Sequence, residues 1–297
     1  MSNQTKGTLS LVLASFVWGM AFSAQSTAMK YVQPFTFVFL RSTITCLVLI
    51  VSMPLFRKIS GEGQGAVATG AQHLRAGIPI GLFLVAATIL QQIGLVYTTP
   101  AKSGFVTALY IVMVPLLGLL FGRKVRWPVW AGVALSLTGL ILLCVQSDMS
   151  VNAGDLFTLG SALMFSGQIL MVGRYAAGMD AVKLSAIQFG TCAVVAGVIA
   201  FAAETPTLSG ILACWQSILY VAVFSGAVGY TLQMVGQKYA DPTLASLLMC
   251  LESVFAALGG WILLGQSLSP RELLGCALML CASIVAQLPI KKALSVP

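Results

Sequence analysis

The stretch LQQIGLVYTTP at 90–100 decides the fold, because it returns later in the chain as LQMVGQKYADP at 232–242. The two copies share five residues at a constant offset of 142 positions; in the first copy they are Leu90, Gln91, Gly94, Tyr97 and Pro100. In each copy an apolar run precedes the motif and another apolar run follows it. The chain therefore consists of two related halves, and the motif marks the same junction in both.

Lipid is the solvent for most of the side chains. Of the 297 residues, 58% are apolar and 8% are charged, whereas an ordinary soluble domain has about 25% charged residues. The mean hydropathy is +0.96, and apolar runs recur from one end of the sequence to the other. A soluble domain of this length has too little interior to bury so much apolar surface, so the sequence predicts an integral membrane protein.

Ten segments are long and apolar enough to cross a bilayer as helices, which takes about 20 residues each. They are 8–28, 35–53, 77–96, 101–121, 129–146, 154–173, 183–203, 211–232, 243–264 and 272–289. The junction at Tyr97–Lys102 is short, and joining the segments on either side of it gives nine helices instead.

Five helices in each half make the repeat an inverted one. Residues 1–149 form the first half and residues 150–297 the second in this interpretation. Because five is odd, the second half enters the membrane from the opposite side. The predicted fold is an all-α integral membrane protein with ten transmembrane helices in two inverted five-helix repeats. Many secondary transporters have this architecture, with the site near the midplane between the repeats.

The basic residues indicate the orientation of the chain. With the N-terminus in the cytoplasm, twelve Lys and Arg residues fall on the cytoplasmic side and three, Lys30, Lys102 and Arg271, fall on the outer side. This positive-inside bias predicts cytoplasmic N- and C-termini. The net charge of +8 is dispersed in ones and twos along the chain, so no nucleic-acid partner is predicted.

Two ionisable residues, Arg41 and Glu252, lie clearly inside predicted spans. Each costs about 2.5–3.5 kcal/mol to insert, so each needs a reason to be there. One interpretation places Glu252 in a central cavity, as a protonatable coupling site or as the partner of a substrate amine. A second makes Arg41 and Glu252 a static ion pair, because their depths in the membrane are similar. In a third, Arg41 extends to the outer interface and neutral Glu252 bonds to helix backbone.

Neutral polar and aromatic residues inside the spans predict the lining of the cavity. Trp18, Phe22 and Gln25 share one face of the first helix, at i, i+4 and i+7 spacing. The predicted substrate-binding set is Trp18, Phe22, Gln25, Gln91, Tyr110, Gln168, Tyr230, Gln233 and Glu252. Hydrogen-bonding groups among aromatic rings suit a small amphipathic solute. The alternative is that these amides and phenols only join helices to one another.

The sequence contains no recognisable catalytic, metal-binding or cofactor-binding motif. Its single histidine, His73, falls in a Gly-rich segment at 59–76 that we expect to be a loop, and HExxH and GxSxG motifs are absent. The motif Gly65-x-x-x-x-Gly70 lacks the Lys and Ser/Thr of a phosphate-binding loop. The seven cysteines include no CxxC pair. We therefore predict no enzyme activity, no cofactor and no metal.

Several short motifs, in their order and spacing, resemble those of a known family. They are Trp18-Gly19, Phe39-Leu40-Arg41, Pro115 to Gly122 before Arg123-Lys124, Gly154-Asp155-Leu156, Leu251-Glu252-Ser253-Val254-Phe255 and Leu264-Gly265. This pattern, over residues 8–289, resembles the EamA-type branch of the drug/metabolite transporter (DMT) superfamily. The chain departs from the family pattern with Ser253 where Pro is usual and with Gly265-Gln266 where Gly-Glu is frequent.

The resemblance implies a multi-pass, ten-helix transporter of the bacterial cytoplasmic (inner) membrane that exports metabolites, amino acids or drugs by alternating access. We expect a secondary transporter of small organic solutes, whose partners are a small-molecule substrate, the lipid bilayer and, as a candidate coupling ion, protons. The alternative is a passive facilitator or uniporter with the same cavity, and a third hypothesis is a non-transporting membrane protein. The sequence leaves open the substrate, the direction of transport and whether a homodimer forms.

Overall fold

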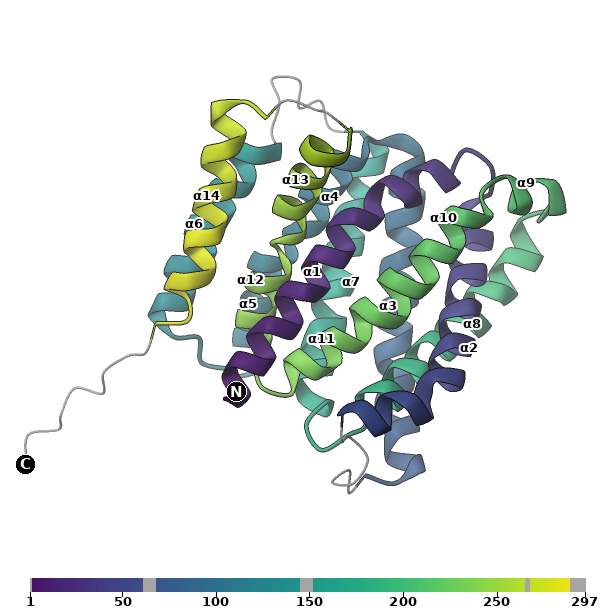
Figure 1. The fold of residues 1–297 in the computed structure, drawn as a ribbon, viewed down its shortest axis with the longest axis horizontal. Coiled ribbons are helices and arrows are strands. Elements are labelled where there is room, and N and C mark those ends of the chain that lie inside the picture. The colour runs from purple at the N-terminus through teal and green to yellow at the C-terminus, as the bar shows by residue number, and fades with distance from the viewer. Residues whose placement is uncertain (1, 61–67, 145–151, 265–267, 289–297) are drawn as a thin grey trace, which may run out of the picture.

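The computed structural model describes residues 2–60, 68–144, 152–264 and 268–288, and every regular element within them is a helix (Figure 1). The elements are α1 Asn3–Ala28, α2 Pro34–Ser60, α3 Gly70–Tyr97, α4 Pro100–Ala108, α5 Tyr110–Leu120, α6 Trp127–Cys144, α7 Ala153–Tyr175, α8 Ala181–Ala203, α9 Leu208–Ala213, α10 Trp215–Tyr220, the π-helix η1 Val221–Gly229, α11 Tyr230–Gln237, α12 Pro242–Met249, α13 Glu252–Leu264 and α14 Pro270–Val285. The predicted boundary between the halves at 149–150 and the Gly265-Gln266 position lie outside the described residues.

The described helices confirm an all-α membrane protein. Eight helical segments are long and apolar enough to cross a bilayer, and a shorter apolar helix covers Pro242–Leu258. The segment predicted at 272–289 appears as the 16-residue helix α14. The count of ten spans therefore stays a prediction. The short junction near Tyr97 is a true break, because α3 ends there and Thr99 caps a new helix by accepting a hydrogen bond from the Lys102 backbone N–H.

The repeated motif ends in Pro for a local reason. Pro100 and Pro242 each occupy the first turn of a helix, where a missing N–H costs nothing. The residue before each proline caps the helix: Thr99 accepts from one backbone N–H, and Asp241 accepts from the N–H groups of Thr243 and Leu244. The two copies of the motif therefore start equivalent helices, α4 and α12.

Three predicted spans are interrupted where the sequence predicted single helices. The segment 211–232 falls on α9, α10, the π-helix η1 and the start of α11, and the other two segments each divide once. The segment 101–121 divides into α4 and α5, and the segment 243–264 divides into α12 and α13. At the first break the Leu109 N–H donates to the Val106 carbonyl, and at the second the Leu251 N–H donates to the Leu248 carbonyl. These bonds reach three residues back rather than four, which tightens the turn. These two breaks lie at equivalent positions of the repeat.

Helix packing between the halves follows a mirrored pattern. α1 packs against α10, η1 and α11 as well as α12 and α13, and α7 packs against α3 as well as α4 and α5. α2 packs against α8, and α6 against α14 (Figure 1). Exchanging the two halves leaves this set of partners unchanged, as an inverted repeat requires. The contacts support the predicted division into two five-helix repeats, which stays a prediction.

Close glycine contacts repeat the mirrored pattern. A Cβ atom on Gly94 of α3 would lie 2.9 Å from the carbonyl oxygen of Gly154 in α7. A Cβ atom on Gly236 of α11 would lie 3.1 Å from the carbonyl oxygen of Gly7 in α1. Small residues let membrane helices approach closely. We call the end of the bundle where α1 begins and α14 ends the near end, and the opposite end the far end (Figure 1).

Two apolar clusters form the core on either side of the bundle centre. One joins α5, α6, α12 and α14 through residues such as Leu140, Leu247 and Met279, and the other joins α2, α3 and α8 through residues such as Leu49 and Phe189. Two partly buried aromatic residues that line a central cavity, Trp18 and Phe165, pack against both clusters. The cavity therefore lies between two well-packed regions.

The sequence suggested that His73 lies in a loop, but the structure places it in a helix. It is buried in the first turn of α3, which begins at Gly70 after a capping box formed by Thr69 and Gln72. Its Nε2 accepts a hydrogen bond of 3.1 Å from the backbone N–H of Asp180. The histidine therefore joins α3 to the start of α8.

Candidate functional site

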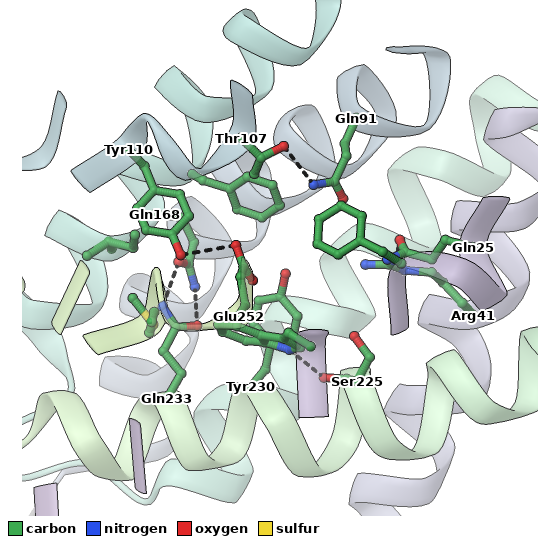
Figure 2. A pocket seen from close by; sticks show the side chains of 15 residues that line it. Gln25, Arg41, Gln91, Thr107, Tyr110, Gln168, Ser225, Tyr230, Gln233 and Glu252 are labelled. Carbon is green, nitrogen blue, oxygen red and sulfur yellow. Dashed lines mark hydrogen bonds between the residues drawn. The ribbon is translucent and has the colours of Figure 1, made fainter. Parts of the chain in front are cut away.

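One cavity in the middle of the bundle brings together all ten residues predicted for substrate binding or coupling (Figure 2). Its lining is Trp18, Phe22, Gln25, Arg41, Gln91, Thr107, Tyr110, Phe165, Gln168, Ile169, Ser225, Tyr230, Gln233, Met249 and Glu252. These residues come from α1, α2, α3, α4 and α5 of the first half and from α7, η1, α11, α12 and α13 of the second. Their convergence is an observation, and their role in binding stays a prediction.

Five lining residues were missed in the sequence: Thr107, Phe165, Ile169, Ser225 and Met249. The repeat contains a signal for two of them, because Phe165 and Ile169 follow the predicted lining residues Trp18 and Phe22 of α1 by 147 residues. Met249 follows Thr107 by 142 residues, so these two missed residues are equivalent to each other. Extending the repeat to the first helix of each half would have paired Phe165 and Ile169 with α1.

Glu252 forms one pole of the cavity. It is the first residue of α13, directly after the break in the ninth predicted span, and its side chain is 5% exposed. Its Oε1 accepts a hydrogen bond of 3.2 Å from the hydroxyl of Tyr110 (Figure 2). Tyr110 begins α5 after the equivalent break in the first half, so the two residues are repeat equivalents that meet at the interface between the halves.

Arg41 forms the other pole. Its side chain is 3% exposed, and its guanidinium Nη1 donates a hydrogen bond of 2.9 Å to Oε1 of Gln25. The same oxygen accepts from Nε2 of Gln92 at 2.6 Å, so the amide of Gln25 is held between two donors. The guanidinium carbon lies 6.0 Å from the centroid of the Phe37 ring. Arg41 is therefore fixed within the protein interior and does not extend to the outer interface.

The static ion pair between Arg41 and Glu252 is not formed. The carboxylate of Glu252 contacts a tyrosine and the guanidinium of Arg41 contacts a glutamine, and no contact among the described residues joins the two charges. Figure 2 shows them on different sides of the cavity. Similar depth in the membrane does not bring two side chains together when their helices face different parts of the lining.

Amide side chains line the cavity between the poles. Nε2 of Gln233 donates to Oε1 of Gln168 at 3.0 Å and to Oε1 of Gln237 at 3.0 Å, and Nε2 of Gln91 donates to Oγ1 of Thr107 at 3.1 Å. Gln91 and Gln233 are repeat equivalents with different bonding partners, and each bonds within its own half. These bonds fix the amides, and side-chain hydrogen bonds of this kind also stabilise helix packing.

Trp18 is positioned by the π-helix. Its indole Nε1 donates to the Ser225 carbonyl at 3.1 Å, and its ring centroid lies 4.9 Å from that of Tyr230. A second carbonyl of η1, that of Ala222, accepts from Oγ1 of Thr45 at 2.8 Å. A π-helix changes the backbone bonding pattern, so its carbonyls can accept from side chains of neighbouring helices. Trp18 and its repeat equivalent Phe165 are the two aromatic residues that pack against both core clusters.

The cavity is small in this conformation. Its volume is about 50 Å³, which holds a few water molecules. Sites for drug-sized ligands occupy roughly 300–1,000 Å³, so an organic solute requires the lining to move apart. Within the described residues no group of three or more His, Cys, Asp or Glu side chains is suited to hold a metal ion.

The family is decided by the match to a family model. The model described as "EamA-like transporter family" matches residues 5–145 and 152–287. This chain belongs to the EamA-like transporter family. The resemblance inferred from the short motifs is thereby confirmed, and this EamA-like chain is a multi-pass membrane transporter.

Relatives of this EamA-like protein also have transporter names. An uncharacterized transporter from Archaeoglobus fulgidus is 28% identical over 288 residues, covering 95% of this chain and 86% of the relative. The uncharacterized inner membrane transporter YedA of Escherichia coli K12 is 29% identical over 192 residues, covering 62% of this chain and 61% of YedA. The threonine/homoserine exporter RhtA of the same strain is 34% identical over 74 residues, covering 25% of each chain.

A solved crystal structure has the same fold. It is titled only "Crystal structure of protein" and superposes with a TM-score of 0.76 at 19% sequence identity, covering 95% of this chain and 96% of the other. The likeness shows that the fold exists in a second protein.

Proposed function

We propose that this EamA-like protein is a secondary transporter that exports a small amphipathic metabolite, amino acid or drug by alternating access, and that Glu252 couples export to protons. The observation that carries the proposal is the central cavity. It lies between the two predicted repeats and combines two buried ionisable residues, a set of amides and several aromatic rings. Alternating access moves one repeat against the other around such a site.

Glu252 is suited to coupling because of its surroundings. It is buried, faces the cavity and bonds to the hydroxyl of Tyr110 rather than to a cation. A buried carboxylate without a cationic partner is costly in a membrane, so it gains from taking up either a proton or a positively charged group. Proton and solute amine then compete for the same carboxylate, which links their movements.

The alternative is a passive facilitator. In that case the Tyr110–Glu252 bond only joins α5 to α13, and the cavity passes solute down its gradient without a coupled proton. The bond also spans the interface between the two halves, which is where a structural contact would be placed. Measuring flux against a gradient separates the two hypotheses.

The test is counterflow in proteoliposomes with labelled amino acids and amphipathic amines, with and without an imposed pH gradient. The wild type is compared with Glu252→Gln and with the control Glu272→Gln. Glu272 lies outside the cavity, in the capping box of α14, where Gln also serves. We expect exchange in the wild type and the control to respond to the gradient, and exchange in Glu252→Gln to lose that response.

Two results contradict parts of the proposal. Exchange that ignores the pH gradient and is unchanged in Glu252→Gln overturns proton coupling and favours the facilitator. Absence of flux for every solute overturns transport of this solute class and favours a non-transporting membrane protein.

A further inference from the structure

We propose that the cavity selects a zwitterionic solute, with the anionic group of the solute bound by Arg41 and its ammonium group bound by Glu252. This inference rests on the proposed transport function and names the class of substrate and the residue that recognises each end. Two charges of opposite sign line one cavity without contacting each other.

Arg41 keeps its charge at every physiological pH. Its side chain is 3% exposed, and the contacts described for it are with the neutral side chains of Gln25, Phe37 and Tyr230. A buried guanidinium without an anionic partner is costly. No carboxylate of the described residues contacts it, so an anionic group entering the cavity is the partner that compensates its charge.

The side chain of Arg41 has the geometry to bind a carboxylate. A guanidinium has five N–H donors in a planar fork that matches a carboxylate. Gln25 accepts from one Nη atom and is itself held by Gln92, which fixes the position of the guanidinium at the cavity wall. This arrangement suits two parallel hydrogen bonds to a carboxylate.

Glu252 has acceptor sites that the described residues do not use. Tyr110 donates to one of its two carboxylate oxygens, Oε1. A carboxylate has about four acceptor sites, so an ammonium group with three donors can bind beside the tyrosine. The negative charge of Glu252 is then compensated by the solute itself.

The two charges of the cavity discriminate between classes of solute. A simple amine compensates Glu252 and adds a second positive charge to a cavity that already contains Arg41. A simple acid compensates Arg41 and adds a second negative charge to a cavity that already contains Glu252. A solute with both groups compensates both charges at once. The rings of Trp18 and Tyr230, whose centroids are 4.9 Å apart, offer apolar surface for the side chain of the solute.

The repeat supports a fixed orientation of the solute. The position equivalent to Arg41 is Gln188, 147 residues later, and the position equivalent to Glu252 is Tyr110. Each charge therefore occurs in one half only. The two ends of a zwitterion consequently meet different partners.

The experiment uses each of three amino acids, threonine, leucine and phenylalanine, with its amide, which lacks the carboxylate, and its N-acetyl form, which lacks the ammonium group. Competition against labelled parent amino acid is measured by counterflow in proteoliposomes of the full chain. For the amino acid that exchanges best, we expect the wild type to prefer the zwitterion over either derivative by about tenfold or more.

The variants assign each end of the solute. In Arg41→Gln we expect the ratio by which the zwitterion is preferred over its amide to fall toward one, while its preference over the N-acetyl form remains. In Glu252→Gln we expect the preference over the N-acetyl form to fall and the preference over the amide to remain. The controls Arg271→Gln and Glu272→Gln, adjacent residues of α14 outside the cavity, leave both preferences unchanged. Arg41→Lys keeps the charge without the planar fork, so we expect a preference between those of Arg41→Gln and the wild type.

Three results overturn the inference. If amides or amphipathic amines exchange as well as the zwitterions, the protein is a transporter of cations and only the charge assignment fails. If both preferences fall equally in either variant, the two residues do not recognise separate ends. If the wild type exchanges no solute of any charge, transport fails and this inference fails with it. The derivative series on the wild type needs no variant, so it decides the question even where a variant does not fold.

Discussion

The far end and the near end of the bundle have the same backbone packing and different side-chain contacts. At the far end Gly94 of α3 approaches Gly154 of α7, and at the near end Gly236 of α11 approaches Gly7 of α1. At the far end an ion pair of 2.6 Å also joins Lys102 to Asp155.

The near end has no equivalent ion pair, because its residues differ. Leu244 follows Lys102 by 142 residues, and Thr8 precedes Asp155 by 147 residues. Thr8 instead donates a hydrogen bond of 2.9 Å to Gln287. The repeat therefore fixes how closely the helices approach at both ends, while single substitutions change which side chains join them.

The largest expected effect comes from the glycine contacts that the two ends share. Gly94→Ala and Gly236→Ala each place a methyl group within about 3 Å of backbone in a facing helix. Overpacking of this kind costs about 1–3 kcal/mol. We therefore expect the flux measured by counterflow to fall roughly tenfold in both variants.

The control is Gly118→Ala in α5, where an added Cβ meets no atom closer than 3.7 Å and flux should be unchanged. A strong loss at one end with none at the other would contradict the equivalence of the two ends.

A smaller effect is expected from the ion pair that distinguishes them. Asp155→Asn keeps the capping geometry at Asn152 and removes the charge that faces Lys102. A partly exposed ion pair contributes up to about 1 kcal/mol, so we expect the fraction of molecules open at the far end to rise up to about fivefold. The measurement is the labelling of a cysteine introduced at Gln91 by a membrane-impermeant thiol reagent added at either face.

The converse change sharpens the comparison. Thr8→Asp combined with Leu244→Lys adds a matching ion pair at the near end, so labelling from that side should fall. Unchanged labelling in both sets of variants would mean that the ion pair does not influence opening.

The smallest effect is expected where the halves differ only by one hydrogen bond. Trp18→Phe makes α1 resemble α7 at this position, because its repeat equivalent is Phe165, and it removes the bond to the Ser225 carbonyl. Such bonds in membranes contribute about 0.6 kcal/mol on average, so KM for the exchanged solute should rise about threefold with little change in maximal flux. An unchanged KM would show that the π-helix carbonyl does not position Trp18 for binding.

The sequence predicts the helices well because hydropathy and length alone determine which segments lie in lipid. It does not predict the breaks at Leu109 and Leu251 or the π-helix η1, since these depend on how neighbouring helices meet. Polar lining residues such as Gln91 were predictable because polarity inside a span is costly. Ile169 and Met249 were not, because many apolar residues in the spans look the same, and the repeat pairs only Ile169 with a predicted lining residue.

Arg41 and Glu252 illustrate the remaining gap. Depth along two helices could be estimated from 1.5 Å per residue, but the direction in which each side chain points depends on packing. The sequence therefore allowed an ion pair that the structure replaces with separate contacts to Gln25 and Tyr110.

The most direct test of alternating opening is a distance measurement at both ends of the same protein. Spin labels carried by noncanonical amino acids replace Tyr97 and Leu156 at the far end, or their repeat equivalents Tyr239 and Leu9 at the near end, all of which are exposed. We predict that any change of pH or solute that lengthens the far-end distance shortens the near-end distance in an equal fraction of molecules. Both distances lengthening together, or neither changing under conditions of active exchange, would contradict alternating access around the central cavity.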